Sequence, residues 1–383
     1  SDVCSSDLAL LLHGNRANQV RAGVHYVVLN LLGSSFFLIG VSLLYGLTGT
    51  LNMPDLAVRV ASAEVADAPL IKAAAYLLLI VFGLKAAVLP LCFWLPRAYA
   101  AAPASVAALF AIMTKVGFYA IVRVFTLVFG EQAGPLANLG HELLWWLALP
   151  TIVFGVIGAL GARQLQALLA YLVVISVGTL MAGFAIGNVA ALSAALYYMV
   201  HSTLISAALF LLAGGLHERG HTYQLGAYGG LATRTPRFAG LFAVAAFASL
   251  GLPGFSGFIA EFQVFTGALQ AAPVATVIAV VGILVTAGLF LLALQRLFTG
   301  DTVVPSETDP DKPAEGPRPD RADGTTATAV QPRTATRMQD LRGHEVASVV
   351  PLLLLALVLG LLPRALLDVL EPAAMAVVEL VGR

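Results

Sequence analysis

Charged side chains are scarce in this sequence. Lysine and arginine together number 21 among 383 residues, aspartate and glutamate number another 21, and only 11% of the chain is charged. A soluble globular chain carries about a quarter charged residues, whereas 59% of this chain is apolar. Too little polar surface remains to cover a water-soluble particle of this size, so we predict a membrane protein.

Cysteine and cofactor motifs are also lacking. The two cysteines, Cys4 and Cys92, are far apart, and Cys92 lies in an apolar span, so neither a disulfide nor a cysteine metal site is predicted. His217 and His221 share a loop, but we predict no metal there. The chain has no flavin, iron–sulfur or nucleotide motif, and we predict no cofactor. Acids and bases balance, so nothing indicates a nucleic-acid partner.

Long apolar runs dominate what is present. Each is long enough to cross about 30 Å of hydrocarbon, and backbone groups in lipid must be satisfied within the segment, which predicts helices. The predicted fold is an all-α polytopic membrane bundle of about nine transmembrane helices. These helices are expected at residues 24–48, 70–95, 103–129, 142–162, 165–187, 190–215, 236–270, 273–298 and 346–363.

Composition divides the chain into four parts. Residues 1–23 form an N-terminal segment whose polar start, SDVCSSDL, is unlike the apolar ALLL after it, and we predict a truncated or corrupted N-terminus. Residues 24–298 form the transmembrane domain. Residues 299–343 are polar and rich in proline, which predicts a flexible cytoplasmic linker. Residues 344–383 hold the last transmembrane helix and a short amphipathic tail.

Basic residues are concentrated in every second loop between the predicted helices. They occur before the first predicted helix and then in every second loop, whereas the intervening loops hold mainly acids such as Asp55, Glu64 and Glu131. The positive-inside rule therefore places the N-terminal loop and the linker in the cytoplasm and the C-terminus outside. The basic residues of this set include Arg16, Arg21, Arg97, Arg163, Arg219, Arg234, Arg237 and six in the linker.

Four ionisable residues lie inside predicted spans or beside helix breaks. A charge at the bilayer centre costs about 2.5–3.5 kcal/mol even on insertion scales, so such residues indicate function. They are Lys85 in FGLKAAVLPLCFWLP, Lys115 in AIMTKVGFYAIVR, His201 in YYMVHSTLISAALF and Glu261 in GLPGFSGFIAEF. We predict that they form a proton relay.

Each of these residues has a structural alternative. Lys85 could satisfy a backbone carbonyl freed by Pro90, and Lys115 could extend its amine to the membrane interface. His201 could be a hydrogen-bonded packing residue. Glu261 could cap the second half of a broken helix.

Two segments carry helix-breaking residues next to an ionisable group. Pro90 follows Lys85, and the predicted helix 236–270 is interrupted at 251–257 by Pro253, Gly254 and Gly257. A helix broken at membrane depth is tolerated where it lines a cavity or is buried in protein. Paired broken helices in corresponding positions indicate an inverted-repeat transporter, so we predict a partial inverted repeat.

At these residues the chain resembles the antiporter-like subunits shared by multisubunit Mrp cation/proton antiporters and respiratory complex I. The resemblance runs from Ala9 to about Pro372 and is greatest to the D-type subunit of Mrp. It is carried by LNLLGSSFFLIGVSLLYGLTGTLNMPDLA, GLKAAVLPLCFWLPRAYAAAPASVAALFAIMTKVGFYAIVR and YLVVISVGTLMAGFAIGNVAALSAALYYMVHSTLISAALFLLAG. It implies a whole protein of fourteen helices, of which this chain holds the sixth to the fourteenth.

The resemblance also implies roles. Lys85 matches the proton-binding lysine of the broken seventh helix, Lys115 the connecting lysine of the eighth and His201 a histidine of the eleventh. Glu261 occupies the terminal ionisable position of the twelfth. The family's fifth-helix glutamate, which pairs with the lysine of the seventh, has no counterpart in SDVCSSDL, and Ser206 stands where many relatives have lysine. The D-type subunits usually have lysine at the position of Glu261, and glutamate there is more like the M-type subunit of complex I.

These observations lead to one functional hypothesis and two rivals. The leading one is a proton-translocating subunit of a multisubunit Na+ or K+/H+ antiporter, multi-pass in the bacterial inner membrane, with other subunits and lipid as partners. The alternatives are an M-like proton-pumping subunit of an NADH–quinone oxidoreductase or membrane hydrogenase, and a non-conducting scaffold. Any redox chemistry would belong to partner subunits.

Overall fold

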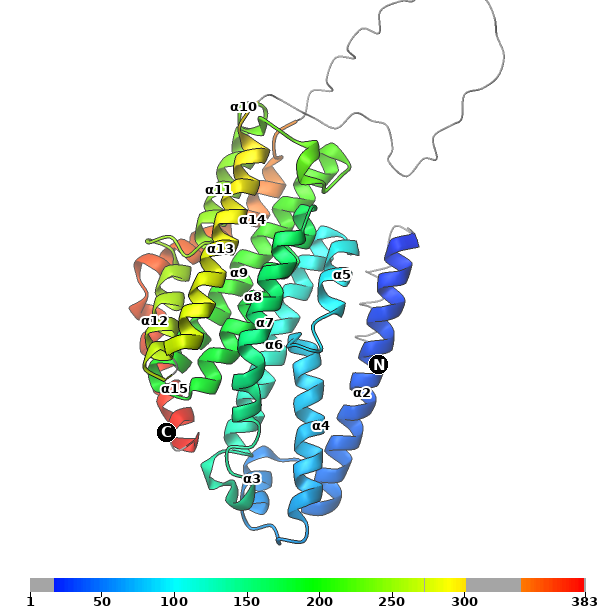
Figure 1. Ribbon diagram of the computed structural model, residues 1–383, viewed down its shortest axis with the longest axis vertical. Helices are drawn as coiled ribbons and strands as arrows, with labels where there is room; N and C mark the ends of the chain where they lie inside the picture. The colour runs from blue at the N-terminus through cyan, green and yellow to red at the C-terminus, as the bar shows by residue number, and fades with distance from the viewer. Residues whose placement is uncertain (1–16, 272, 301–338, 382–383) are drawn as a thin grey trace, which may run out of the picture.

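The fold is described by a computed structural model that covers residues 17–271, 273–300 and 339–381 (Figure 1). Eight of its helices are long and apolar enough to cross a membrane. They are α2 (Ala17–Thr48), α4 (Ala68–Ala86), α6 (Ala104–Leu127), α7 (His141–Gly161), α8 (Leu165–Ile186), α9 (Val189–Gly220), α13 (Pro273–Phe298) and α14 (Gly343–Leu361).

Shorter helices complete the described part of the chain. Of these, α11 (Pro236–Ser249) and α12 (Ser256–Ala271) follow one another and make a ninth crossing that is broken at residues 250–255. The predicted all-α membrane bundle, with its broken helix around 251–257, is therefore confirmed. The remaining elements are α3 (Met53–Ala61), α5 (Trp94–Ala101), η1 (Glu131–Leu136), η2 (Leu225–Ala227), α10 (Leu231–Arg234) and α15 (Arg364–Val381).

Local sequence sets several helix ends. Gly187 ends α8 in the left-handed conformation, with φ of 74°, which glycine adopts without steric cost. Asn188 then caps α9, since its side chain accepts a hydrogen bond of 2.7 Å from the backbone N–H of Ala191. This pair of residues turns the chain sharply between two long helices, so α8 and α9 pack side by side.

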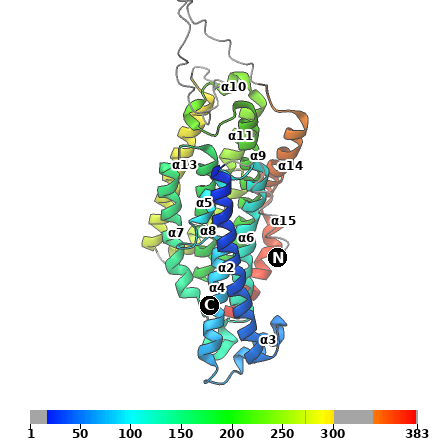
Figure 2. The ribbon, with the colours of Figure 1, turned by 90° about the vertical axis from the view of Figure 1, so that its right-hand side faces the viewer.

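The core of the bundle lies along α8 and α9. In α8, 83% of the most apolar stretch is buried inside the protein, against 22% in α2 and in α14. α9 contacts α6, α8, α12, α14 and α15, and Figures 1 and 2 show it running through the middle of the elongated bundle. Ionisable residues on the inner faces of these helices are therefore separated from lipid by surrounding helices.

Several predicted boundaries were wrong. The helix predicted at 24–48 begins at Ala17, and the helix predicted at 70–95 ends at Ala86. The stretch between the helices predicted at 70–95 and 103–129 is largely helical, because α5 occupies it. Residues 53–61 form an unpredicted amphipathic helix, α3. The predicted tail from 364 is the helix α15, with its Leu367, Ala374 and Val378 buried.

The loops predicted to be basic gather at one end of the bundle. Leu165 N–H donates to the Tyr223 carbonyl at 2.8 Å, and Gly230 N–H donates to Thr299 at 3.1 Å. The acidic loops meet at the other end, where α3 packs against η1.

Most of the predicted linker, residues 301–338, and most of the predicted N-terminal segment lie outside the described residues.

Candidate functional site

Lys85 lies in the last turn of α4 and points across to α2. It is half-buried, and its Nζ donates a short hydrogen bond to Oδ1 of Asn30. Asn30 is buried, at 6% exposure, and its own Nδ2 donates to the Tyr26 carbonyl at 2.8 Å. The amine of Lys85 is therefore held by a neutral side chain on the neighbouring helix.

The break after Lys85 is satisfied by other groups. α4 ends at Ala86, and the next residue, Ala87, adopts the left-handed conformation with φ of 63°. The Leu84 carbonyl accepts from the Trp94 indole at 3.0 Å, and Leu89 N–H donates to Thr151 Oγ1 at 3.0 Å. The exposed Pro90 lies between α4 and α5. Lys85 thus bonds to Asn30 rather than to a freed carbonyl, contrary to the structural alternative.

Lys115 is enclosed near the middle of α6. It is 3% exposed, and its Nζ donates a 2.9 Å hydrogen bond to Ser176 Oγ on α8. Ser176 donates in turn to the Val173 carbonyl at 2.7 Å. A lysine that reached for the interface would carry its amine toward the helix end, whereas this amine points to the interior of the bundle.

His201 connects α9 to the second broken helix. It is 3% exposed, and its Nδ1 lies 2.8 Å from Oγ of Ser256, the first residue of α12. Gly257 fits tightly against the ring, since a Cβ atom there would lie 2.8 Å from His201 Nε2 and 2.6 Å from the Ala248 carbonyl oxygen. The break at 250–255 places the start of α12 against the imidazole and close to the end of α11.

Glu261 lies on α12, half-buried, and its carboxyl lies near the Tyr198 side chain. Tyr198 also stacks on His201, with ring centroids 5.8 Å apart. A Cβ atom at Gly251 would lie 2.6 Å from Oε2 of Glu261. The carboxyl therefore lies over the broken segment, near the tyrosine that stacks on His201.

A small cavity lies between His201 and Ser176, the hydrogen-bond partner of Lys115. Its volume is about 30 Å³, and a cavity needs roughly 10–15 Å³ to hold one water molecule. Ser176, the partner of Lys115, lines it together with His201, so a proton could pass between them through water and hydroxyl groups. Its other polar lining residues are Tyr198, Ser202, Ser206 and Ser249.

Lys85 lies on the helix that packs against α6, but in the described part of the chain no side-chain hydrogen bond joins it to Lys115, Ser176 or His201. α6 packs closely on the end of α4, because a Cβ atom at Gly117 would lie 2.9 Å from the carbonyl carbon of Lys85. In the described part of the chain, the hydrogen bonds of Lys85 and Lys115 go to Asn30 and Ser176 respectively. The structure thus links Lys115, His201 and Glu261 through shared neighbours and places Lys85 on the adjoining helix pair.

Sequence reasoning missed the neutral partners of these residues. Asn30, Ser176, Tyr198 and Ser256 all contact a predicted site residue. The signal that could have found them was a polar residue within an apolar run, as in YVVLNLLG around Asn30 and VVISVG around Ser176. A buried polar side chain needs a hydrogen-bond partner, and here the partner is an ionisable one.

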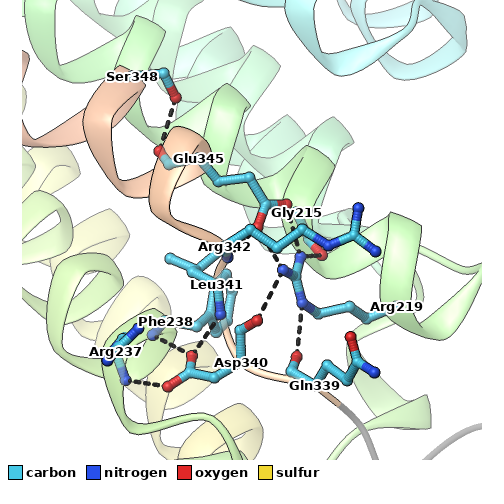
Figure 3. Close-up of polar contacts among 10 residues, drawn as sticks. All are labelled: Gly215, Arg219, Arg237, Phe238, Gln339, Asp340, Leu341, Arg342, Glu345 and Ser348. Carbon is cyan, nitrogen blue, oxygen red and sulfur yellow. Dashed lines mark hydrogen bonds and ion pairs between the residues drawn. The ribbon is translucent and has the colours of Figure 1, made fainter.

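A second polar cluster holds residues 339–345, which include the end of the predicted linker, against α9 and α11 (Figure 3). Arg219 at the end of α9 forms an ion pair of 2.6 Å with Glu345 and donates to the carbonyls of Gln339 and Asp340. The Asp340 carboxylate accepts from the backbone N–H groups of Arg237 and Phe238 in the first turn of α11. Arg219, predicted as a loop residue, is thus a packing residue in the last turn of α9.

No metal centre is evident among the described residues, which contain no group of three or more His, Cys, Asp or Glu able to hold an ion. His217 stacks on Tyr223, with ring centroids 4.3 Å apart. His217 thus lies in the last turn of α9 and not in the predicted loop, and it packs against Tyr223.

A polytopic helix bundle with broken helices and ionisable residues along its axis defines a class of membrane proteins built around an intramembrane polar site. The sequence profile of one family, described as NADH:quinone oxidoreductase/Mrp antiporter, transmembrane, matches residues 3–286. The chain belongs to this family, as the resemblance to the Mrp and complex I superfamily predicted.

Two curated relatives illustrate the similarity, and both are D-type antiporter subunits. The chain is 41% identical over 259 residues to the D-type subunit of the Na+/H+ antiporter of Bacillus subtilis, covering 67% of this chain and 51% of that protein. It is 40% identical over 323 residues to the D-type subunit of a probable K+/H+ antiporter of Rhizobium meliloti, covering 77% of this chain and 60% of that protein. The chain spans about half to three-fifths of the length of these relatives.

Solved structures give the same picture of the fold. A chain of the Mrp complex from a Dietzia species superposes with a TM-score of 0.81 at 29% identity, covering 98% of this chain and 71% of that one. A chain of respiratory complex I from Thermus thermophilus, solved with bound NADH, also gives 0.81, at 26% identity, covering 100% of this chain and 74% of that one. Both neighbours belong to multisubunit membrane assemblies.

Proposed function

We propose that this chain forms the proton-translocating part of a D-type subunit in a multisubunit Na+ or K+/H+ antiporter of the bacterial inner membrane. Protons would move between Lys85, Lys115, His201 and Glu261. The observation that supports this most directly is the polar track from Lys115 through Ser176 and the cavity to His201. Tyr198 lines the same cavity, stacks on His201 and lies near Glu261.

The energetics of burial favour a relay over a purely structural role. An ionisable group inside a membrane protein is costly and is retained mostly where it serves transport. Lys115 and His201 are each 3% exposed and each has a hydroxyl partner. A hydroxyl donates and accepts, so it can pass a proton in either direction. Partner subunits, lipid, and Na+ or K+ are part of this proposal.

A proton-pumping role in a complex I-like assembly is the second candidate. Two observations favour it: Glu261 stands at the position where the resemblance to the M-type subunit has glutamate, and the chain superposes equally well on a complex I chain. Cation dependence separates the two candidates, because an antiporter subunit supports proton flux that requires Na+ or K+ in the absence of a redox substrate.

The test is proton flux in everted vesicles that contain the assembled complex. Flux is followed with a pH-sensitive dye after Na+ or K+ is added. Lys85→Ala, Lys115→Ala and Glu261→Gln are expected to abolish the cation-dependent signal while assembly is retained. The matched controls are Lys72→Ala, an exposed lysine of the same helix α4 as Lys85, and Glu142→Gln, an exposed glutamate of α7. Unchanged flux in the site variants would support the non-conducting scaffold instead.

A further inference from the structure

The end of α4 and the middle of α6 meet in a contact between backbones. Gly117 of α6 faces the last two residues of α4. A Cβ atom at Gly117 would lie 2.5 Å from the backbone nitrogen of Ala86, and 2.9 Å from both the Ala86 Cα and the carbonyl carbon of Lys85. No side chain fits at these distances, so the two helices approach this closely because residue 117 is glycine.

This contact lies between two residues of the proposed relay. Lys85 is one of the residues that Gly117 faces, and Lys115 lies two positions before Gly117, about 3 Å along the helix axis. In the described part of the chain no side-chain hydrogen bond joins the two lysines, since their amines bond to Asn30 on α2 and to Ser176 on α8. The backbone contact at Gly117 therefore fixes the position of one lysine relative to the other.

The surroundings of the contact leave little room for movement. Ala86 and Ala87 at the end of α4 are 0% exposed, as is Phe118 beside Gly117. The Val88 N–H donates to a carbonyl of the last turn of α4 at 2.9 Å, which closes the end of the helix. Because protein interiors are close-packed, a methyl group at residue 117 would be accommodated by moving the end of α4 away from α6.

We propose that Gly117 is a positioning residue of the relay, which sets the separation of Lys85 and Lys115 by letting the end of α4 rest directly on α6. The rate of a reaction depends steeply on the placement of the groups that react, and a displacement of about 1 Å can lower it about a hundredfold. The proposal rests on the proposed relay function of the two lysines.

The experiment measures cation-dependent proton flux per assembled complex in everted vesicles, in H2O and in D2O, for Gly117→Ala. Flux is expected to fall about tenfold. The ratio of flux in H2O to flux in D2O is expected to rise, because proton transfer between the lysines becomes the slow step. A loss of correctly folded complex would lower flux in both solvents equally and leave the ratio unchanged. Wild-type flux with a wild-type ratio in Gly117→Ala would overturn the proposal.

Gly83→Ala is the first matched control, because it adds the same methyl group to α4 two residues before Lys85. A Cβ atom at Gly83 meets only Leu91 Cδ1, at an ordinary contact distance of 3.8 Å. This variant should keep the wild-type flux and the wild-type ratio. A loss of flux and a higher ratio equal to those of Gly117→Ala would mean that the close contact at residue 117 has no special part in transfer.

Gly183→Ala is the second control, because it creates a similar clash between other helices. A Cβ atom at Gly183 of α8 would lie 2.7 Å from the Ala195 Cβ and 2.9 Å from the Ala191 carbonyl oxygen, both on α9. It should lower the thermal stability of the complex in detergent without changing the isotope ratio. A ratio raised as much as in Gly117→Ala would overturn the proposal, since overpacking anywhere would then have the same effect.

Ala86→Gly tests the same contact without a clash, in case Gly117→Ala fails to assemble. It removes a methyl group and adds backbone freedom at the end of α4, so flux should fall and the ratio should rise. Ala75→Gly, an equally buried position earlier in α4, should change neither. Wild-type flux and ratio in Ala86→Gly would overturn the proposal, while loss of flux in Lys85→Ala and Lys115→Ala would still uphold the relay. Normal flux in the two lysine variants would overturn the relay itself.

Discussion

At the scale of single residues, the relay depends on hydroxyl and amide partners as much as on the titratable groups. Lys115 has one hydrogen-bond acceptor in the described structure, the Ser176 hydroxyl at 2.9 Å. Removing one partner of a buried donor costs about 1–3 kcal/mol. We expect Ser176→Ala to reduce proton flux by about one order of magnitude while the complex still assembles, as measured in everted vesicles.

The matched control for this variant is Ser35→Ala. Ser35 is an exposed serine in α2 whose hydroxyl bonds only to the Leu31 carbonyl of its own helix. It should transport normally. Equal flux in the two alanine variants would mean that Lys115 does not use Ser176.

Gly257 provides a residue-scale test of the contact between His201 and the broken helix. A methyl group there would lie 2.6 Å from the Ala248 carbonyl and 2.8 Å from His201 Nε2, and overpacking of this kind costs about 1–3 kcal/mol. We expect Gly257→Ala to lower both the thermal stability of the complex in detergent and its flux. Gly288→Ala is the control, since a Cβ atom in that helical position meets no atom within 4 Å. Similar stability and flux in the two variants would contradict the close contact.

The ionisable residues themselves were predictable from sequence, because a charge inside an apolar span is costly enough to stand out. Their hydrogen-bond partners were not among the predicted site residues. Asn30 and Ser176 are uncharged and common in helices, and only the packing of α2 on α4 and of α6 on α8 shows that they face a lysine. The transfer of protons by the four predicted ionisable residues remains a prediction.

At the scale of helices, the sequence signalled the position of the α11–α12 break better than the end of α4. GLPGFSG interrupts the apolar pattern with proline and three glycines, so the break was visible in the letters. The end of α4 at Ala86 lies four residues before Pro90. It is stabilised by Trp94 and Thr151, which bond to the freed backbone groups. Tertiary contacts of this kind leave no periodic signal.

Another element-scale feature is the clamp made by Arg219, Asp340 and Glu345. It joins α9 to the starts of α11 and α14. Arg219 and Glu345 have side chains only 10% and 17% exposed, and breaking a largely buried pair leaves an uncompensated charge. We expect Arg219→Met to destabilise the complex by about 2–3 kcal/mol, seen as a lower thermal midpoint in detergent.

The exchange Arg219→Glu with Glu345→Arg is expected to restore part of this loss, since it recreates the pair but not the bonds to the Gln339 and Asp340 carbonyls. The exposed pair Arg59–Asp55, with side chains 50% and 44% exposed, is the control. Exposed pairs contribute about 0–1 kcal/mol, so Arg59→Met should have little effect. If Arg219→Met and Arg59→Met lowered the thermal midpoint equally, the burial of the Arg219–Glu345 pair would contribute nothing to the stability of the complex.

At the scale of the whole molecule, composition alone predicted the class of fold, because a chain with 11% charged residues cannot cover itself with polar surface. The amphipathic helix α3 was not predicted, and α15 was predicted only as an amphipathic tail. Neither helix is apolar enough to be recognised as a transmembrane span. Their burial depends on neighbours, α3 on η1 and α15 on α6 and α9. The predicted inverted repeat remains a prediction.

The arrangement of loops yields a prediction about the orientation in the membrane. The loops at 162–164 and 221–235 join through the Leu165–Tyr223 and Leu225–Arg163 backbone hydrogen bonds, and the Arg219 clamp lies at the same end. The acidic residues Asp55, Glu64 and Glu131 belong to the opposite end. Because basic residues are retained on the cytoplasmic side, we expect the clamp end to be cytoplasmic.

Labelling of single cysteines in intact cells tests this orientation, on a background with Cys4 and Cys92 replaced. Val65→Cys and His221→Cys place one thiol at each end, and both parent residues are exposed. A membrane-impermeant maleimide should label the cysteine at 65 in intact cells, and the cysteine at 221 only after the cells are opened. The reverse result would invert the orientation.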